Sequence, residues 1–280
     1  MADSVLLSES TRTNLTSLQR TTDLIQRTQE RLSTGKKVNS ALDDALAFFQ
    51  SRDLNTRASE LQTIKSDIQQ GQMTVETAVK GLEKVEDTLK QMQALAESAK
   101  STAEADTGSR ANLYTQFNEL RSQIDHLVND ATYNGVNLIQ SGADTLTVEF
   151  SEARTSATLE IKGKNQTASG LGIQSATKNN WTQTSGYSDA INNRIDELDT
   201  AVETVRDTSQ QFGINSSTLK IREEFTSDLM STLENGAAQL VEADMNEEAA
   251  KMTSLQTRQQ LGTVSLSIAQ QSQQSIMRLF

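Results

Sequence analysis

Very few side chains in this sequence are of the types that carry out catalysis. There is one histidine, His126, and there is no cysteine. A lone imidazole has no second histidine or thiolate with which to share a metal ion, and no thiol to activate as a nucleophile. We therefore predict that His126 is a surface or interface residue.

Acidic residues occur in adjacent pairs at positions 43–44, 223–224 and 247–248. Two carboxylates can act as acid and base on one substrate only when both point into the same site. Neighbouring helical residues point in different directions, so we interpret these pairs as exposed or capping acids. Gly170-Leu-Gly172 is too short for a phosphate-binding loop. We expect no enzyme activity, no cofactor and no metal site.

The overall charge narrows the choice of partners. The 280 residues include 37 acidic and 26 basic side chains, for a net charge of −11, whereas nucleic acid requires a basic surface. No stretch approaches the roughly 20 consecutive apolar residues of a membrane span. The N-terminus lacks the basic region and apolar core of a cleaved secretory signal. We expect no nucleic-acid partner and no membrane partner.

Composition and periodicity favour long helices. Aromatic residues make up 4% and proline is absent, which suits long helices that bury narrow apolar stripes against one another. Apolar residues recur every seven positions from residue 54 to residue 96, with a second row three positions later. This heptad pattern predicts a helix with one face against a partner, and a weaker row from residue 191 predicts that partner. We call the predicted contact face between these two helices the outer-domain seam. Its residues are Leu61, Ile68, Val75, Leu82, Leu89, Ile195 and Val202.

Residues 140–190 have a different pattern. Residues 146–150 and 157–161 alternate apolar and polar side chains, as half-buried strands do, and the polar stretch 151–156 suits a loop between them. We predict a mainly α fold of long antiparallel coiled-coil helices with this small β-hairpin insertion.

The two ends of the chain differ electrically from its middle. Residues 45–245 carry 17 basic and 29 acidic side chains, whereas no residue from Gln259 to Met277 is charged. Such a charge-free segment is suited to burial among other protein helices, because amides and hydroxyls cost less to desolvate than charges. We predict that both ends pack against other helices through Leu18, Ile25, Leu32, Leu261, Val264, Ile268, Ile276 and Leu279.

Several stretches resemble bacterial flagellin, the subunit of the flagellar filament. Near the N-terminus they are residues 30–35 (ERLSTG), 38–41 (VNSA) and 43–44 (DD), and before the insertion residues 133–139 (YNGVNLI). After it they are residues 169–173 (SGLGI), 243–250 (ADMNEEAA) and 255–262 (LQTRQQLG). Order, spacing and position at both ends of the chain all fit that family.

The resemblance implies a division of labour along the chain. Residues 1–44 and 246–280 would form an inner coiled-coil domain in the core of a filament, and residues 45–245 an outer helical domain. The subunit would polymerise with copies of itself into the propeller for swimming. Export through the flagellar type III apparatus would place it outside the cell. Its other partners would be an export chaperone, the filament cap and hook–filament junction proteins.

Three features depart from the usual family pattern. Few residues separate Asn137 from Tyr187, which predicts a short form without large outer domains. Residues 46–49 (LAFF) replace a stretch of small residues. Gln91, Gln93 and Ala94 stand where many flagellins present the two arginines and a glutamate that an innate immune receptor binds, which predicts weak or absent signalling through that receptor.

Two other functions fit parts of the pattern. A hook–filament junction protein of the same family would share the terminal helices, but it would not dominate sheared extracellular protein as a filament subunit does. An intracellular coiled-coil tether would instead form a dimer that stays in the cytoplasm.

Overall fold

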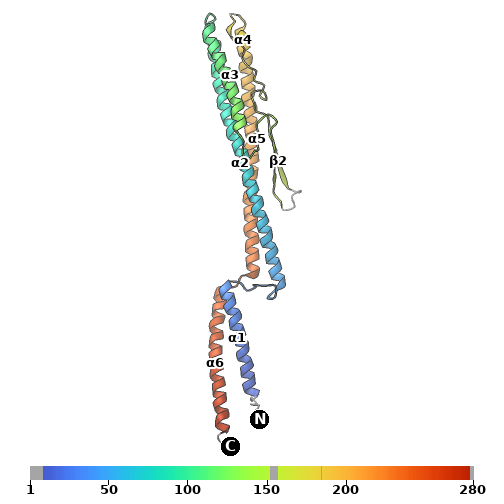
Figure 1. The fold of residues 1–280 in the computed structure, drawn as a ribbon, viewed down its shortest axis with the longest axis vertical. Coiled ribbons are helices and arrows are strands. Elements are labelled where there is room, and N and C mark those ends of the chain that lie inside the picture. The colour runs from blue at the N-terminus through green and yellow to red at the C-terminus, as the bar shows by residue number, and fades with distance from the viewer. Residues whose placement is uncertain (1–8, 152–156, 184, 278–280) are drawn as a thin grey trace. The chain divides into compact units, whose positions relative to one another are not determined.

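The computed structural model describes residues 9–151, 157–183 and 185–277. In chain order the elements are α1 (Glu9–Thr34), α2 (Ala45–Ser101), α3 (Thr107–Asp130), β1 (Thr145–Glu149), β2 (Thr158–Lys162), α4 (Lys178–Thr182), α5 (Tyr187–Val241) and α6 (Met245–Met277). The predicted fold, long helices with one small hairpin, is confirmed (Figure 1). Contacts divide the chain into two units, residues 57–231 and residues 1–56 with 232–280.

In the 57–231 unit, α2 and α5 run antiparallel in unbroken register. Polar contacts link Lys65 to Ser227, Gln69 to Glu223, Glu86 to Arg206 and Gln93 to Asp199. Each step forward along α2 is matched by an equal step backward along α5, so neither helix slips against the other. Between these polar contacts the apolar rows interlock, as a heptad pattern requires.

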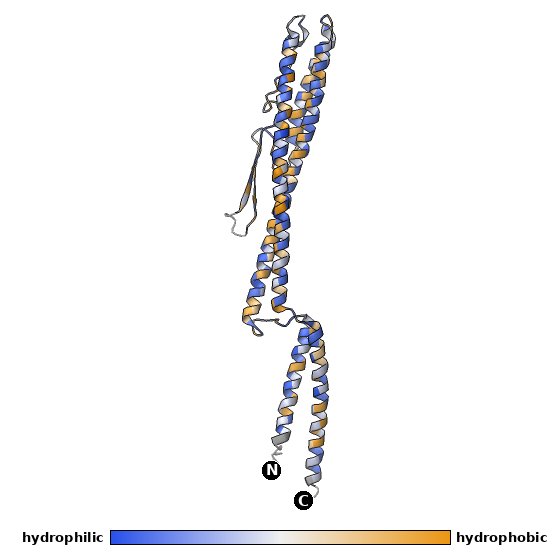
Figure 2. Ribbon diagram, turned by 180° about the vertical axis from the view of Figure 1, so that it is seen from behind, coloured by the Kyte–Doolittle hydropathy of each residue, from blue (hydrophilic) through white to orange (hydrophobic). Residues whose placement is uncertain are grey.

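A third helix, α3, completes the core of this unit. Phe117, Ile124 and Val128 of α3 are fully buried against the apolar rows of the long helices. Gly81 of α2 permits the close approach, because a Cβ there would lie 2.8 Å from the Cβ of Ala131, just beyond α3. Figure 2 shows apolar residues, in orange, interspersed with polar ones along these helices.

The end of the unit where α2 turns into α3 is held together by Arg110, which is fully buried. Its guanidinium donates hydrogen bonds to the backbone carbonyls of Ala103, Glu104, Trp181 and Gln183 at 2.6–3.2 Å. The ring of Tyr187 lies 4.1 Å from its Cζ. One side chain thus joins the α2–α3 loop, α4 and the start of α5. Sequence patterns predicted neither α4 nor this contact.

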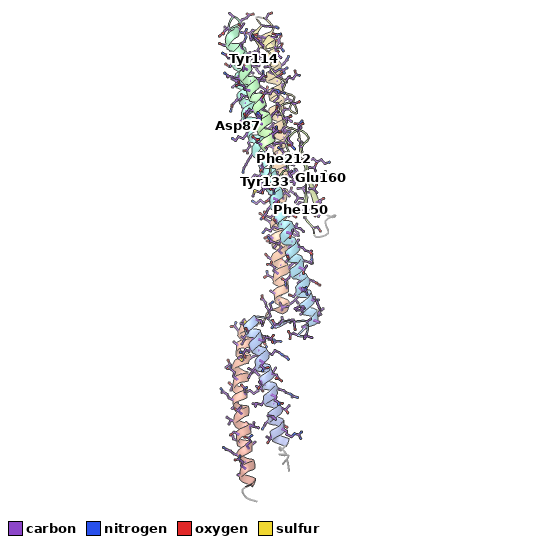
Figure 3. All side chains as sticks on the ribbon, in the orientation of Figure 1. Asp87, Tyr114, Tyr133, Phe150, Glu160 and Phe212 are labelled. Atoms are coloured by element: carbon purple, nitrogen blue, oxygen red, sulfur yellow. The ribbon has the colours of Figure 1, made fainter. Side chains whose placement is uncertain are left out.

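Each strand of the hairpin is shifted by one residue from the range that the sequence predicted. β1 and β2 pair antiparallel from Thr145 opposite Lys162 to Glu149 opposite Thr158. Phe150, labelled in Figure 3, follows β1 and lies under the guanidinium of Arg222, 5.2 Å from its ring centre. The predicted loop 151–156 lies almost entirely outside the described residues.

A tight turn leads from α3 towards the hairpin, within the segment 133–139 singled out in the sequence. Asn134 and Gly135 both take positive φ angles, 49° and 79°. Asparagine and glycine are the residues that tolerate this left-handed conformation, so the two side-chain types fit the turn. Backbone hydrogen bonds between Tyr133 and Val136 close it at 2.9 and 3.0 Å.

In the other unit, α1 packs along α6. The loop after α1 also pairs with the segment after α5: Lys37 N donates to Val241 O at 2.7 Å, and Ala243 N to Gly35 O at 2.9 Å. These bonds tie the end of α5 to the terminal helices. Contacts therefore divide the chain inside α2 and α5.

Candidate assembly surfaces

The outer-domain seam is the interior of the 57–231 unit. Its five α2 members, Leu61, Ile68, Val75, Leu82 and Leu89, are 0–4% exposed, and Val202 of α5 is 7% exposed. Ile195 is half-buried against the same core. These residues hold the unit together, so they are not available to a partner.

The second unit uses one face of α6 to hold α1. Met252, Leu255, Gly262 and Leu266 are half-buried at helical spacing on that face. Opposite them on α1, Leu18, Ile25 and Leu32 are half-buried as well. A Cβ on Gly262 would come within 2.8 Å of Leu18 Cδ1, so glycine permits the two helices to approach closely here. The N-terminal stripe thus has a partner inside its own chain.

A buried carboxylate with two partly exposed basic partners lies on the same face. Glu248 is 4% exposed, and its Oε1 accepts from Arg31 and from Lys251, both at 3.2 Å. Burial raises the pKa of Glu248, but the hydrogen bonds from Lys251 and Arg31 lower it by more, so the pKa lies below its ordinary value of 4.5. The interpretation of this residue as an exposed or capping acid was wrong. Periodicity does not reveal that α1 covers it.

The opposite face of α6 has no cover within the described chain. Leu261, Val264 and Ile268 are 64%, 56% and 61% exposed on it. Ile276 lies in the last turns of α6, where its side chain is not described, and Leu279 lies outside the described residues. Further apolar side chains that the sequence reasoning missed are also exposed in this unit: Leu15, Leu24, Leu42, Leu46 and Phe49.

The other predicted site residues lie on the surface of α2 and α3. Gln91 and Ala94 are exposed, whereas Gln93 donates to Asp199 Oδ1 of α5 at 2.6 Å and is half-buried. Gln93 therefore also helps to fix the register of the helix pair. His126 is exposed on α3.

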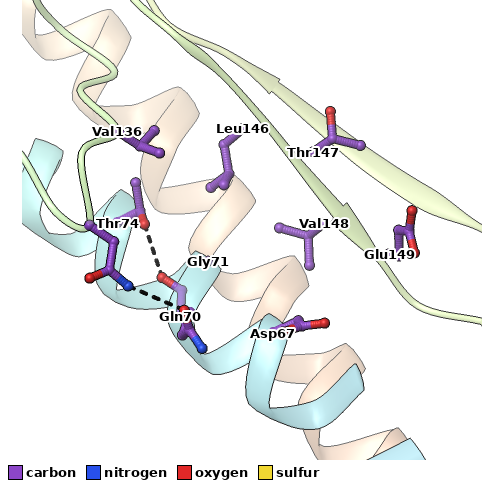
Figure 4. Close-up of a pocket in the computed structure, with 10 residues that line it drawn as sticks. Asp67, Gln70, Gly71, Thr74, Val136, Leu146, Thr147, Val148 and Glu149 are labelled. Carbon is purple, nitrogen blue, oxygen red and sulfur yellow. Dashed lines mark hydrogen bonds between the residues drawn. The ribbon is translucent and has the colours of Figure 1, made fainter. Parts of the chain in front are cut away.

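A shallow cleft lies beside the hairpin. Its volume is about 330 Å³, and its lining includes Gly71 and Thr74 of α2 and Leu146 and Val148 of β1 (Figure 4). Asn134 closes one side by donating to Gln70 Oε1 at 3.2 Å. The cleft therefore lies where the hairpin packs against α2.

In the described part of the chain, no three histidine, cysteine or acidic side chains gather where they could hold a metal ion. No helix there is long and apolar enough to cross a membrane.

The fold and these surfaces define a helical structural protein that presents apolar side chains on its terminal helices. Comparison with known protein families identifies the family within this class. The bacterial flagellin N-terminal helical region matches residues 6–144, and the bacterial flagellin C-terminal helical region matches residues 195–280. The chain therefore belongs to the bacterial flagellin family, and it is a structural subunit of the flagellar filament.

Individual relatives match over nearly their whole length. Flagellin FljM of Caulobacter vibrioides is 32% identical over 268 residues, 95% of this chain and 94% of the relative. A flagellin of Brucella melitensis is 26% identical and covers 99% of each chain. A putative flagellar hook-associated protein from Vibrio parahaemolyticus superposes with a TM-score of 0.59 over 71% of this chain and 100% of its own. At 16% identity, this last likeness shows the fold alone.

Proposed function

We propose that the subunit polymerises through the exposed faces of its terminal helices. Residues 1–44 and 246–280 form the inner core of the filament, and residues 45–245 form its outer domain. The observation that carries this proposal is the two-sided character of α6. One side holds α1, while the other exposes Leu261, Val264 and Ile268 to more than half of their full extent.

Burial of that face contributes to the driving force for polymerisation. Complete burial of an aliphatic side chain contributes about 1.5–3 kcal/mol, so burying the exposed part of these three residues contributes roughly 3–5 kcal/mol per subunit. The segment from Gln259 to Met277 carries no charge that would have to be desolvated. If the matching surface lies elsewhere on the next copy, and the rotation between copies does not close a ring, the contact repeats into an open helix.

The same proposal includes the location of the subunit outside the cell and the proteins that it contacts there and before export. The subunit reaches the outside of the cell through the flagellar export apparatus. Before export, a cytoplasmic chaperone holds the terminal helices; afterwards the cap and junction proteins border the filament at its two ends. The acidic middle, with 29 acidic against 17 basic residues, faces water and limits sideways association.

A sedimentation assay of purified protein tests the proposal. Wild-type protein should pellet as filaments above a critical concentration. Removal of residues 261–280, or Ile268→Asp, should leave the protein in the supernatant, because a buried unpaired carboxylate costs several kcal/mol. Ile268→Leu, which keeps the side chain apolar, is the matched control and should pellet.

Circular dichroism must show that the Ile268→Asp monomer keeps its helices, since the native side chain is 61% exposed. Normal pelleting of Ile268→Asp would contradict the proposal.

A further inference from the structure

The turn between α1 and α2 holds a leucine almost completely in water. Leu42 is 98% exposed. Single exposed leucines are common on protein surfaces. Here Asp43 Oδ2 accepts from the backbone nitrogens of Asn39 and Ser40, at 3.1 and 3.0 Å, and from the Ser40 hydroxyl at 3.2 Å. Residues 39–44 therefore form a preformed turn with Leu42 at its tip.

A cleft of complementary character lies between α1 and α6 in the same unit. Its volume is about 600 Å³, and Leu24, Ala250 and Leu255 give it apolar lining. Arginine stems extend this apolar surface. Leu42 does not fill the cleft of its own chain, because it is exposed to solvent.

Four basic side chains and two acidic ones, Glu247 and Glu248, line this cleft, and Glu247 pairs with Lys251 at 2.8 Å. Arg31 and Lys251 are paired with Glu248. Arg27 and Arg258 also line the cleft, and in the described part of the chain neither has an ion-pair partner. The two unpaired guanidinium groups provide sites for carboxylates beside an apolar pocket.

The charges of the turn match those of the cleft. Leu42 is followed directly by Asp43 and Asp44, so the turn presents one apolar side chain next to two acids. We propose that Leu42 of one subunit inserts into the α1–α6 cleft of a neighbouring copy, with the two aspartates facing Arg27 and Arg258. The contact is heterologous, because two different surfaces meet, and it can therefore repeat along an open helix. This inference rests on the proposed polymerisation and names one of its contacts.

Because the chain has no cysteine, cross-linking gives a specific test. Two single variants, Leu42→Cys and Ala250→Cys, are mixed, polymerised and oxidised, and the products are run on a non-reducing gel. A disulfide between the two variants can form only between copies. Ala249→Cys is the matched control, since Ala249 is also an exposed α6 alanine but does not line the cleft.

We expect a cross-linked dimer with Ala250→Cys, and at least tenfold less with Ala249→Cys. Filaments that form without this dimer, or that give it equally with both partners, would overturn the inference. Those outcomes leave the proposed function intact. That function fails instead if wild-type protein does not polymerise, or if Ile268→Asp polymerises normally.

If Leu42→Cys does not polymerise, critical concentrations decide the question. Leu42→Ala should raise the critical concentration about tenfold or more, whereas Leu42→Met, which also fills an apolar pocket, should stay within about twofold of wild type. Equal values for Leu42→Ala and wild type, or failure of Leu42→Met as well, would overturn the inference.

Discussion

Gly71 and Gly213 offer a matched pair of substitutions that isolates the docking of the hairpin on α2. Both glycines lie inside long helices, and alanine at either position gains helix propensity worth about 0.8–1 kcal/mol. A Cβ at Gly213 meets nothing within 4 Å. A Cβ at Gly71 would lie 2.7 Å from Val148 Cγ2, closer than such contacts occur.

The expected changes in the free energy of unfolding therefore differ between the two variants. Gly213→Ala should stabilise the protein by about 0.5–1 kcal/mol. At Gly71 the same gain is opposed by overpacking, which costs about 1–3 kcal/mol. Val148 is 3% exposed, and its β-branched side chain has little rotamer freedom with which to move away. Gly71→Ala should thus be less stable than Gly213→Ala by about 1–3 kcal/mol.

Urea unfolding followed by circular dichroism measures this difference. Val148→Ala removes the methyl groups that the new Cβ would meet. The double variant with Gly71→Ala should therefore be less destabilised than the two single variants together predict, by about 1 kcal/mol or more. Equal stabilisation by Gly71→Ala and Gly213→Ala, or strict additivity in the double variant, would refute the reasoning.

Three further predictions concern other parts of the chain. Arg110→Met should destabilise the protein by about 3 kcal/mol or more in the same urea assay, because four carbonyl oxygens lose their donor; a loss below 1 kcal/mol would contradict that role. The lowered pKa of Glu248 contributes stability that is present above pH 4.5 and is lost as the pH falls below it, so α1–α6 pairing should weaken in acid. Glu248→Gln should flatten this dependence in a pH titration of the helical signal, and an unchanged titration would count against the ion pair. Monomer bearing Gln91 and Gln93 should signal weakly in a reporter-cell assay of the innate receptor, and potency equal to that of an arginine-bearing flagellin would show that these positions do not matter.

The sequence alone determined the class of fold and the interior of the 57–231 unit. A heptad row is a local property, and Ile68, Val75 and Leu82 recur at a spacing that only a helix turns into one face. The strands were also predictable, to within a residue, from alternation. The family followed from motifs at both ends of the chain.

Only the tertiary structure decided which apolar face packs against another helix of the same chain and which face stays exposed to solvent. Leu18 and Ile268 looked equivalent in the sequence, yet α6 covers the first while the second is 61% exposed. Sequence spacing likewise does not show whether a side chain is buried or exposed in the cases of Arg110, Glu248 and Leu42. Periodicity fixes the direction in which a side chain leaves its own helix. What it meets there depends on residues more than 200 positions away, as with Arg31 and Glu248, and only the packed chain brings those together.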